Sequence, residues 1–281
     1  MSRRTGPRLM FASLLALLLV SPLAFMLDRT SAQQTSTSAV SGANLYFYRD
    51  GKIGVAHRDP DQLPVGQSIY DAALTELFKG PADDELSSGL SSVLPSGSSL
   101  ASATVVDSNG VATVNLGIEF STMGENQPVT GRVLGLRMAQ IASTLTQFSN
   151  VTGVQFQISG TPNLAYDSDG AAVNRPVTRN DYESVTPAIL VETPGVWDRF
   201  ESPLHLTGTA NTFEATVQYR LSDARNQVVT EGHFSATSGT GTRGTFDETI
   251  PFDVTRQGRA TLLVYELSAA DGSMINVVAI P

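Results

Sequence analysis

The region from Ser202 to Ile250 alternates apolar and polar residues in short runs, which Gly, Asn and Asp interrupt. Val217, Tyr219 and Leu221 alternate with polar neighbours, and this period of two is typical of a half-buried strand. The same pattern extends to the end of the chain, so we expect this whole region to be all-β. Its predicted strands are 188–192, 203–209, 214–221, 226–236, 243–252, 259–268 and 274–280.

The first part of the chain begins with a predicted hairpin and helix. Leu45–Tyr48 and Ile53–His57 flank Asp50-Gly51, a dipeptide that favours a tight hairpin turn. Apolar residues then recur every four positions, which predicts a helix over about 68–79 that Gly80-Pro81 ends. Pro81 can open a second short helix, because acidic residues follow it and stabilise a helix N-terminus.

Two more strands and a longer helix follow. Leu100–Asp107 and Val111–Leu116 are joined through Asn109-Gly110, which is a strong hairpin signal. An apolar stripe with spacings of four and three predicts the longer helix, and a strand over 154–158 closes the domain. The order β-β-α-α-β-β-α-β predicts an α+β sandwich with its helices on one sheet face. The stripe consists of Leu134, Met138, Ile141, Leu145 and Phe148.

The N-terminus carries an export segment. Three arginines precede an apolar run from Leu9 to Leu27, which is the charged region and hydrophobic region of a signal peptide. Thr30-Ser31-Ala32 offers a small-residue cleavage site. The apolar run is also long enough to stay uncleaved as a membrane anchor. Both alternatives, a signal peptide or an anchor over 1–32, place the remainder outside the cytoplasmic membrane.

Two domains with connecting segments account for the 281 residues. The α+β sandwich is expected over 44–161, behind a flexible Ser/Thr/Gln/Ala-rich spacer over 33–43. A polar linker over 162–187, with one extra strand or hairpin, leads to the second domain over 188–281. The number of strands in the second domain predicts an immunoglobulin-like sandwich.

Composition excludes several classes of function. The formal net charge of −9 argues against nucleic-acid binding and against electrostatic attachment to an anionic membrane. Because the chain has no cysteine, it can form no disulfide, thiolate metal site, cysteine nucleophile or lipidated-cysteine anchor. Any membrane association is therefore expected only through the N-terminal segment.

No sequence pattern indicates catalytic, metal or cofactor chemistry. His57, His205 and His233 are scattered without the spacing of metal ligands. The chain lacks a Gly-x-Ser-x-Gly nucleophile elbow, and Asp167–Gly170 lacks the further ligands of a calcium loop. We therefore expect a non-enzymatic protein without a cofactor, and a turn at Asp167–Gly170.

Ordered motifs give the chain a family resemblance. Residues 44–161 resemble the GerM-type domain of bacterial sporulation and spore-germination proteins, and 188–281 resemble the immunoglobulin-like domain that accompanies it. The first resemblance lies in Leu45-Tyr46-Phe47, Leu77-Phe78-Lys79-Gly80-Pro81, Gly89-Leu90-Ser91-Ser92, Leu94-Pro95-Ser96-Gly97, Gly110–Leu116 and Leu145-Thr146-Gln147-Phe148. The second lies in Ser202-Pro203-Leu204, Gly208-Thr209-Ala210, Phe213-Glu214-Ala215, Gly244-Thr245-Phe246, Tyr265-Glu266-Leu267-Ser268, Asp271-Gly272-Ser273 and Ile280-Pro281.

The resemblance implies an exported envelope protein with a role like that of sporulation or germination proteins. The GerM-type domain is similar to ring-building modules, so the expected mode of action is docking on an envelope protein or self-association. An alternative is a binding module for peptidoglycan, with Trp197, Arg199 and Phe200 as its binding residues. A wall hydrolase is a third alternative, and it needs an acid/base pair that the sequence does not show. The partner, the oligomeric state and sporulation of the organism stay open.

Overall fold

The computed structural model describes residues 42–123, 127–253 and 257–281. The export segment and the spacer up to residue 41 lie outside the described residues. Within the described ranges, no helix is both long enough and apolar enough to cross a membrane.

A hairpin opens the first domain, as predicted. Strands β1 (Ala43–Arg49) and β2 (Lys52–Arg58) pair antiparallel, with Arg49 opposite Lys52. Asp50 and Gly51 between them both have positive φ angles, 52° and 74°. A two-residue turn of this kind requires that conformation at both positions, and Asp-Gly adopts it readily.

Two helices follow at the places that the sequence predicts. In α1 (Ile69–Lys79), the Ser68 hydroxyl accepts a hydrogen bond from the Asp71 N–H at 3.1 Å and so caps the first turn. Gly80, with φ of 83°, ends the helix. The second helix, α2 (Asp83–Ser87), begins with the predicted acidic residues. A short 3₁₀ helix, η1 (Pro60–Gln62), precedes both.

A four-stranded sheet has the order β3-β4-β7-β8, formed by β3 (Leu100–Val106), β4 (Val111–Leu116), β7 (Gly153–Ile158) and β8 (Thr161–Pro162). Strands β4 and β7 are parallel, and the connection between them contains α3 (Gly131–Leu145). It also contains η2 (Ile118–Ser121), β5 (Thr122–Met123) and β6 (Gln127–Pro128). The predicted apolar stripe of α3 is buried from Leu134 to Leu145. Its last member, Phe148, lies beyond the helix end, where its ring packs edge-on against Tyr70.

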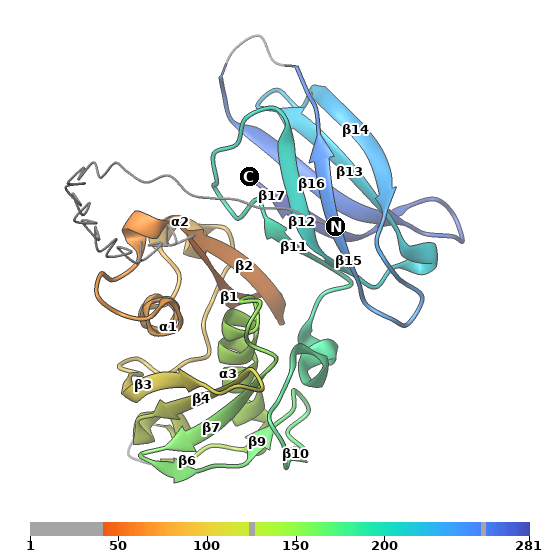
Figure 1. The fold of residues 1–281 in the computed structure, drawn as a ribbon. Coiled ribbons are helices and arrows are strands. Elements are labelled where there is room, and N and C mark those ends of the chain that lie inside the picture. Colours follow the sequence, from red (N-terminus) through yellow and green to blue (C-terminus); the bar gives the residue numbers. More distant parts are fainter. Residues whose placement is uncertain (1–41, 124–126, 254–256) are drawn as a thin grey trace, which may run out of the picture. The chain divides into compact units, whose positions relative to one another are not determined.

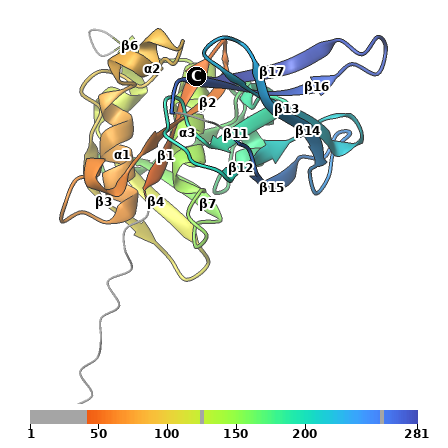
Figure 2. The ribbon, with the colours of Figure 1, turned by 90° about the horizontal axis from the view of Figure 1, so that it is seen from above.

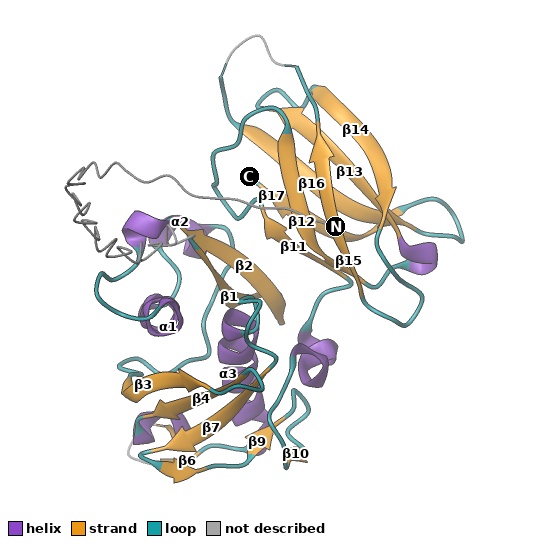
Figure 3. Ribbon diagram, viewed as in Figure 1, coloured by secondary structure: helices purple, strands orange, loops and turns teal. Residues whose placement is uncertain are grey.

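The helices α1 and α3 lie between the β1–β2 hairpin and the four-stranded sheet (Figure 1). Fully buried side chains from all three layers, among them Phe47, Leu74, Met138 and Phe156, form the first core. The arrangement confirms the predicted α+β sandwich, whose helices and strands are coloured separately in Figure 3.

The segment 162–187, interpreted from sequence as a linker, has structure of its own. Strands β9 (Ala165–Tyr166) and β10 (Ala172–Val173) form a small hairpin, and η3 (Arg179–Val185) follows. The expected turn at its tip is present, because the Asp167 carboxylate accepts from the N–H groups of Asp169 and Ala171. Ala165, Val177, Tyr182 and Val185 are buried in the first core.

Two sheets form the second domain, and all the strands predicted there are present. One sheet has the order β11-β12-β15, with β11 (Ile189–Thr193), β12 (Leu204–Ala210) and β15 (Gly244–Ile250). The other has the order β14-β13-β16-β17, with β13 (Thr216–Asp223), β14 (Val228–Ser235), β16 (Ala260–Leu267) and β17 (Met274–Ile280). A one-turn helix, η4 (Phe213–Ala215), connects β12 to β13. The buried residues of both sheets form the second core, so the predicted sandwich is confirmed.

Strand β11 contributes side chains to both cores. Ile189 and Val191 are buried in the second core, whereas Leu190 is buried in the first. Successive side chains of a strand point to opposite faces, which explains this division. Strand β11 also contacts β2, so it joins the two domains physically.

Candidate functional site

A groove of about 620 Å³ lies where the two domains meet, beside β2, β11 and β17. Strand β11 contributes Ile189, Leu190 and Val191, all of which are buried. The remaining lining residues are Arg49, Asp50, Lys52, Ile53, Gly54, Val55, Ser87, Ser88, Pro187, Pro194, Val196, Trp197, Thr261, Val277, Val278, Ala279, Ile280 and Pro281.

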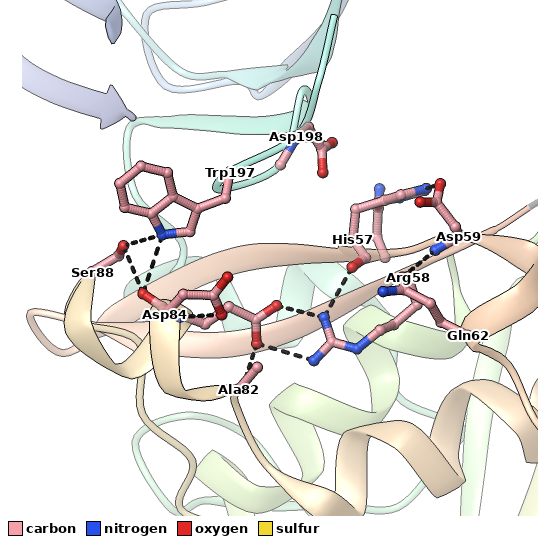
Figure 4. A network of polar contacts seen from close by, with 12 residues as sticks. His57, Arg58, Asp59, Gln62, Ala82, Asp84, Ser88, Trp197 and Asp198 are labelled. Atoms are coloured by element: carbon pink, nitrogen blue, oxygen red, sulfur yellow. Dashed lines mark hydrogen bonds and ion pairs between the residues drawn. The ribbon is translucent and has the colours of Figure 1, made fainter. Parts of the chain in front are cut away.

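Trp197 links this groove to α2. The loop after β11 holds Trp197 at a positive φ of 67°, and its side chain reaches the end of α2. There the indole Nε1–H donates to the Ser88 hydroxyl at 2.9 Å and to the Asp84 carbonyl at 3.2 Å (Figure 4). The Arg259 guanidinium lies 5.5 Å from the ring centroid, which is cation–π distance. Trp197 is therefore held in place by both domains.

The other two candidate residues of the sequence have different surroundings. Phe200 packs edge-on against Phe252 at 6.0 Å between ring centroids and contributes to the second core. Arg199 is exposed, and no polar contact to another described residue is found for its side chain. No contact in the described ranges brings Trp197, Arg199 and Phe200 together as one site.

An ion pair positions the part of α2 that receives Trp197. Arg58 at the end of β2 donates to the Glu85 carboxylate, with 3.0 Å between Nη2 and Oε2. Glu85 also accepts from the Ala82 N–H at 2.7 Å and so caps α2. Burial lowers the pKa of Arg58, but the hydrogen bond and charge of Glu85 outweigh burial and raise it above its usual value. The pair fixes α2 against the hairpin, next to the groove (Figure 4).

A second polar cluster connects β1, η3 and β11. Arg179 Nη1 donates to Glu192 Oε1 at 2.6 Å, and Arg179 Nη2 donates to the Tyr46 hydroxyl at 2.7 Å. The Tyr46 hydroxyl in turn donates to Glu192, and the Arg179 guanidinium lies over the Tyr46 ring. Burial raises the pKa of Tyr46 well above its usual range. The pKa of Arg179, which burial alone lowers, is raised by Tyr46 and Glu192, so its charge is permanent.

A third contact joins η3 to Arg243, the residue directly before β15. Arg243 donates from Nε and Nη2 to the two carboxylate oxygens of Glu183, at 2.8 and 2.9 Å. Arg243 Nη2 also donates to the Pro187 carbonyl at 2.8 Å. Burial raises the pKa of Glu183, but the bidentate pair with Arg243 outweighs burial and lowers it below its usual value. The contacts at Trp197, Glu192 and Glu183 therefore connect the two domains.

The histidines take part in separate local contacts. His57 Nδ1 lies 2.9 Å from Asn44 Oδ1, and His205 Nε2 lies 2.6 Å from Asp247 Oδ1 at exposed positions of β12 and β15. His233 is exposed on β14. Over the ranges that the structure describes, no three His, Asp or Glu side chains converge as metal ligands would.

Sequence reasoning did not single out the groove residues Arg49 and Lys52. The local signal for them was available, since the Asp50-Gly51 turn places its two flanking residues opposite each other. The sequence contains no signal for the distant residues of β17 and β11 that complete the groove.

Comparison with protein families identifies both domains. Residues 44–164 match the family described as sporulation and spore germination. Residues 188–273 match the immunoglobulin-like domain of bacterial spore germination. A search among curated proteins gave no match.

Among the solved structures that are similar to the chain are two of GerMN domains. The tandem GerMN domains of the sporulation protein GerM from Bacillus subtilis share 19% identity at a TM-score of 0.41. That match covers 75% of this chain and 61% of the tandem structure. The first GerMN domain of the same protein shares 22% identity at a TM-score of 0.40, over 50% of this chain and 98% of that one.

The two family matches follow the domain order along the chain and agree with the α+β and all-β folds described above. The chain therefore combines a domain of the sporulation and spore germination family with an immunoglobulin-like domain of bacterial spore germination.

Proposed function

We propose that the chain is an exported, non-enzymatic protein of the cell envelope that acts by docking on another protein. The observation that carries this proposal is the set of three polar contacts between the domains, at Glu192, Glu183 and Trp197. Side chains that bind across a domain boundary hold two surfaces in one orientation, and a pre-organised surface loses less entropy on binding. A scaffold of this kind suits docking.

Export is supported by the N-terminal residues, in which arginines precede an apolar run. Protease added to intact protoplasts that express a C-terminally tagged full chain tests it. We expect the tag to be digested, because both a signal peptide and an anchor place the domains outside. A tag that survives until the membrane is permeabilised would refute export.

Docking is tested on the same cells by chemical crosslinking of the tagged full chain, followed by purification under denaturing conditions. We expect one discrete crosslinked partner protein that cells with an untagged chain do not yield. Crosslinks only to further copies would identify self-association as the mode of action. Absence of any specific crosslink, or wall-hydrolysing activity that persists through purification, would contradict the proposal.

Binding to peptidoglycan is the alternative to exclude. Trp197, its main candidate residue, already donates its indole N–H to α2 and carries Arg259 against its ring. We therefore expect purified cell wall to retain little of the full chain, and the same amount of its Trp197→Ala variant. Strong retention that this substitution abolishes would favour the glycan function.

A further inference from the structure

Strand β17 is an edge strand with neither charge nor proline, and its pairing with β16 has a bulge opposite Val264–Glu266, where Asn276 has a φ of 51°. Its side chains Met274, Ile275 and Val277 are 42%, 39% and 49% exposed. Strand β14 forms the opposite edge of the same sheet (Figure 2). It carries Glu231 and His233. Exposed apolar edges are normally blocked by charge or proline, because they pair with other chains. Strand β17 therefore has the properties of a surface that accepts another strand.

The main chain of β17 points toward the groove. The Ala279 carbonyl accepts from Arg49 Nη1 at 3.2 Å, and the Pro281 carbonyl accepts from the Trp197 N–H at 3.3 Å. Both carbonyls therefore face away from β16. In an extended strand the N–H and C=O of one residue point to the same side, so the Ala279 N–H also faces away from β16. An incoming strand at this edge would pair with the Ala279 N–H and take the place of Arg49 at the Ala279 carbonyl.

The charge of the groove is opposite to that of the whole chain. Arg49 and Lys52 line it, and Arg259 lies against Trp197, whereas Asp50 is the one acidic lining residue in the described ranges. The chain as a whole has a formal net charge of −9. In addition, Arg49 Nε is buried and meets no hydrogen-bond acceptor among the described residues. A cationic groove on an acidic protein selects an anionic ligand.

We propose that β17 receives an extended segment of a partner protein, rich in both apolar and acidic residues, which adds to the sheet as a new edge strand. The backbone of the segment pairs with β17, its apolar side chains cover Ile275 and Val277, and its carboxylates face Arg49, Lys52 and Arg259. This inference rests on the proposed docking function, and it names the docking surface and the chemistry of the partner.

Other occupants fit less well. A glycan offers no regular row of backbone partners for β17, and one face of the Trp197 ring is already covered by Arg259. A second copy of β17 supplies no acidic residue to the groove, because the strand is uncharged. The acidic peptide is the ligand that uses both the strand edge and the cationic groove.

Fluorescence anisotropy with a labelled peptide of ten residues, alternating valine and glutamate, tests the proposal on the full chain in detergent micelles. Two control peptides have lysine in place of glutamate, or N-methyl groups that remove alternate backbone donors. We expect saturable binding of the acidic peptide, and binding at least about tenfold weaker for each control, since one lacks charge complementarity and the other a bonding edge.

A matched pair of variants locates the site. Val277 on β17 and Val228 on β14 are 49% and 51% exposed on opposite edges of one sheet. We expect Val277→Glu to weaken binding by about tenfold or more through repulsion of the acidic peptide, and Val228→Glu to leave it within about twofold. Arg49→Gln is expected to weaken binding as well. Equal melting temperatures of the variants would show that folding is intact.

Several outcomes would overturn the inference: no binding of the acidic peptide, equal binding by Val277→Glu, equal loss in both glutamate variants, or competition by soluble peptidoglycan fragments. Association of the full chain that Val277→Glu abolishes without any peptide binding would identify a second copy as the occupant instead. If Val277→Glu still crosslinks to the native partner on cells, the docking function stands and only its assignment to β17 fails.

Discussion

Arg179 is the residue that most directly joins the two domains. Its side chain is 29% exposed and that of Glu192 is 20% exposed, so the pair is largely shielded from water. Removing one partner of a shielded ion pair leaves the other charge uncompensated, which costs more than the pair itself contributes. We expect Arg179→Leu to lower the free energy of unfolding by about 2–4 kcal/mol. Urea denaturation followed by circular dichroism measures the loss.

The control is a solvent-exposed ion pair on the surface of the second domain. Arg220 and Glu231 pair across β13 and β14 with side chains 33% and 53% exposed. Exposed pairs typically contribute less than about 1 kcal/mol, so Arg220→Leu should change stability by no more than that. A similar loss in both variants would show that the Arg179 contact has no special role.

Glu183 makes stability dependent on pH in the acid range. Its pKa in the folded state is below the usual value, because the hydrogen bonds and charge of Arg243 outweigh burial. The contact therefore stabilises the fold fully above the unfolded pKa of about 4.3, and its contribution is lost as pH falls through the lowered folded value. We expect Glu183→Gln to be less stable than the natural chain at pH 7, and the two to converge as the pH falls through the lowered folded pKa of Glu183.

Urea midpoints at pH 7, 5, 4 and 3 measure this convergence. Glu231→Gln, at the exposed pair, is the matched control, and its difference from the natural chain should stay small throughout. A constant difference between Glu183→Gln and the natural chain at all pH values would contradict the ionic role of Glu183.

These residue contacts could not be predicted from the sequence. Tyr46 and Arg179 are 133 positions apart, and Arg243 and Glu183 are 60 apart. No local periodicity connects such positions, and arginine and glutamate are ordinary surface residues in any single window. Trp197 was conspicuous as the one tryptophan of the chain, yet its contacts with Ser88 and Asp84 depend on how α2 and the loop meet.

At the scale of elements, local sequence signals were sufficient to predict the first hairpin and the helix α1. The Asp50-Gly51 turn sets the register of β1 and β2, and the Ser68 cap together with Gly80 sets both ends of α1. An observed strand boundary differs from the predicted one where a side chain stabilises a turn. Strand β14 begins at Val228, later than predicted, because the Asp223 carboxylate accepts from the N–H groups of Arg225 and Gln227 and forms a turn there.

The side chains of β11 are divided between two cores, and the continuous apolar sequence of the strand does not indicate this division. Leu190 is 5% exposed in the first core, between neighbours that are buried in the second. We expect Leu190→Ala to lower the free energy of unfolding by about 2–4 kcal/mol, because it leaves a cavity where the domains meet. Leu267→Ala on β16, at a side chain 43% exposed, is the control and should cost less than about 1 kcal/mol. Equal losses would place Leu190 outside any packed interface.

At the scale of the whole molecule, the contacts at β11, Arg179, Arg243 and Trp197 should make the two cores unfold together. Domains joined by few contacts melt independently, whereas a packed and hydrogen-bonded boundary couples them. Differential scanning calorimetry of the full chain should therefore show one transition, with calorimetric and van't Hoff enthalpies that agree.

The combined variant Arg179→Leu, Arg243→Leu, Trp197→Ala removes the contacts at Glu192, Glu183 and α2 and keeps the sheets and both cores. We expect it to melt in two transitions, because neither core loses a buried apolar side chain and only the boundary is weakened. A matched triple variant on the exposed faces, Arg220→Leu, Arg225→Leu, Val228→Ala, should retain a single transition. Two transitions in the natural chain would mean that the domains are already independent, and the docking surface between them would then lack the fixed geometry on which the strand-addition proposal depends.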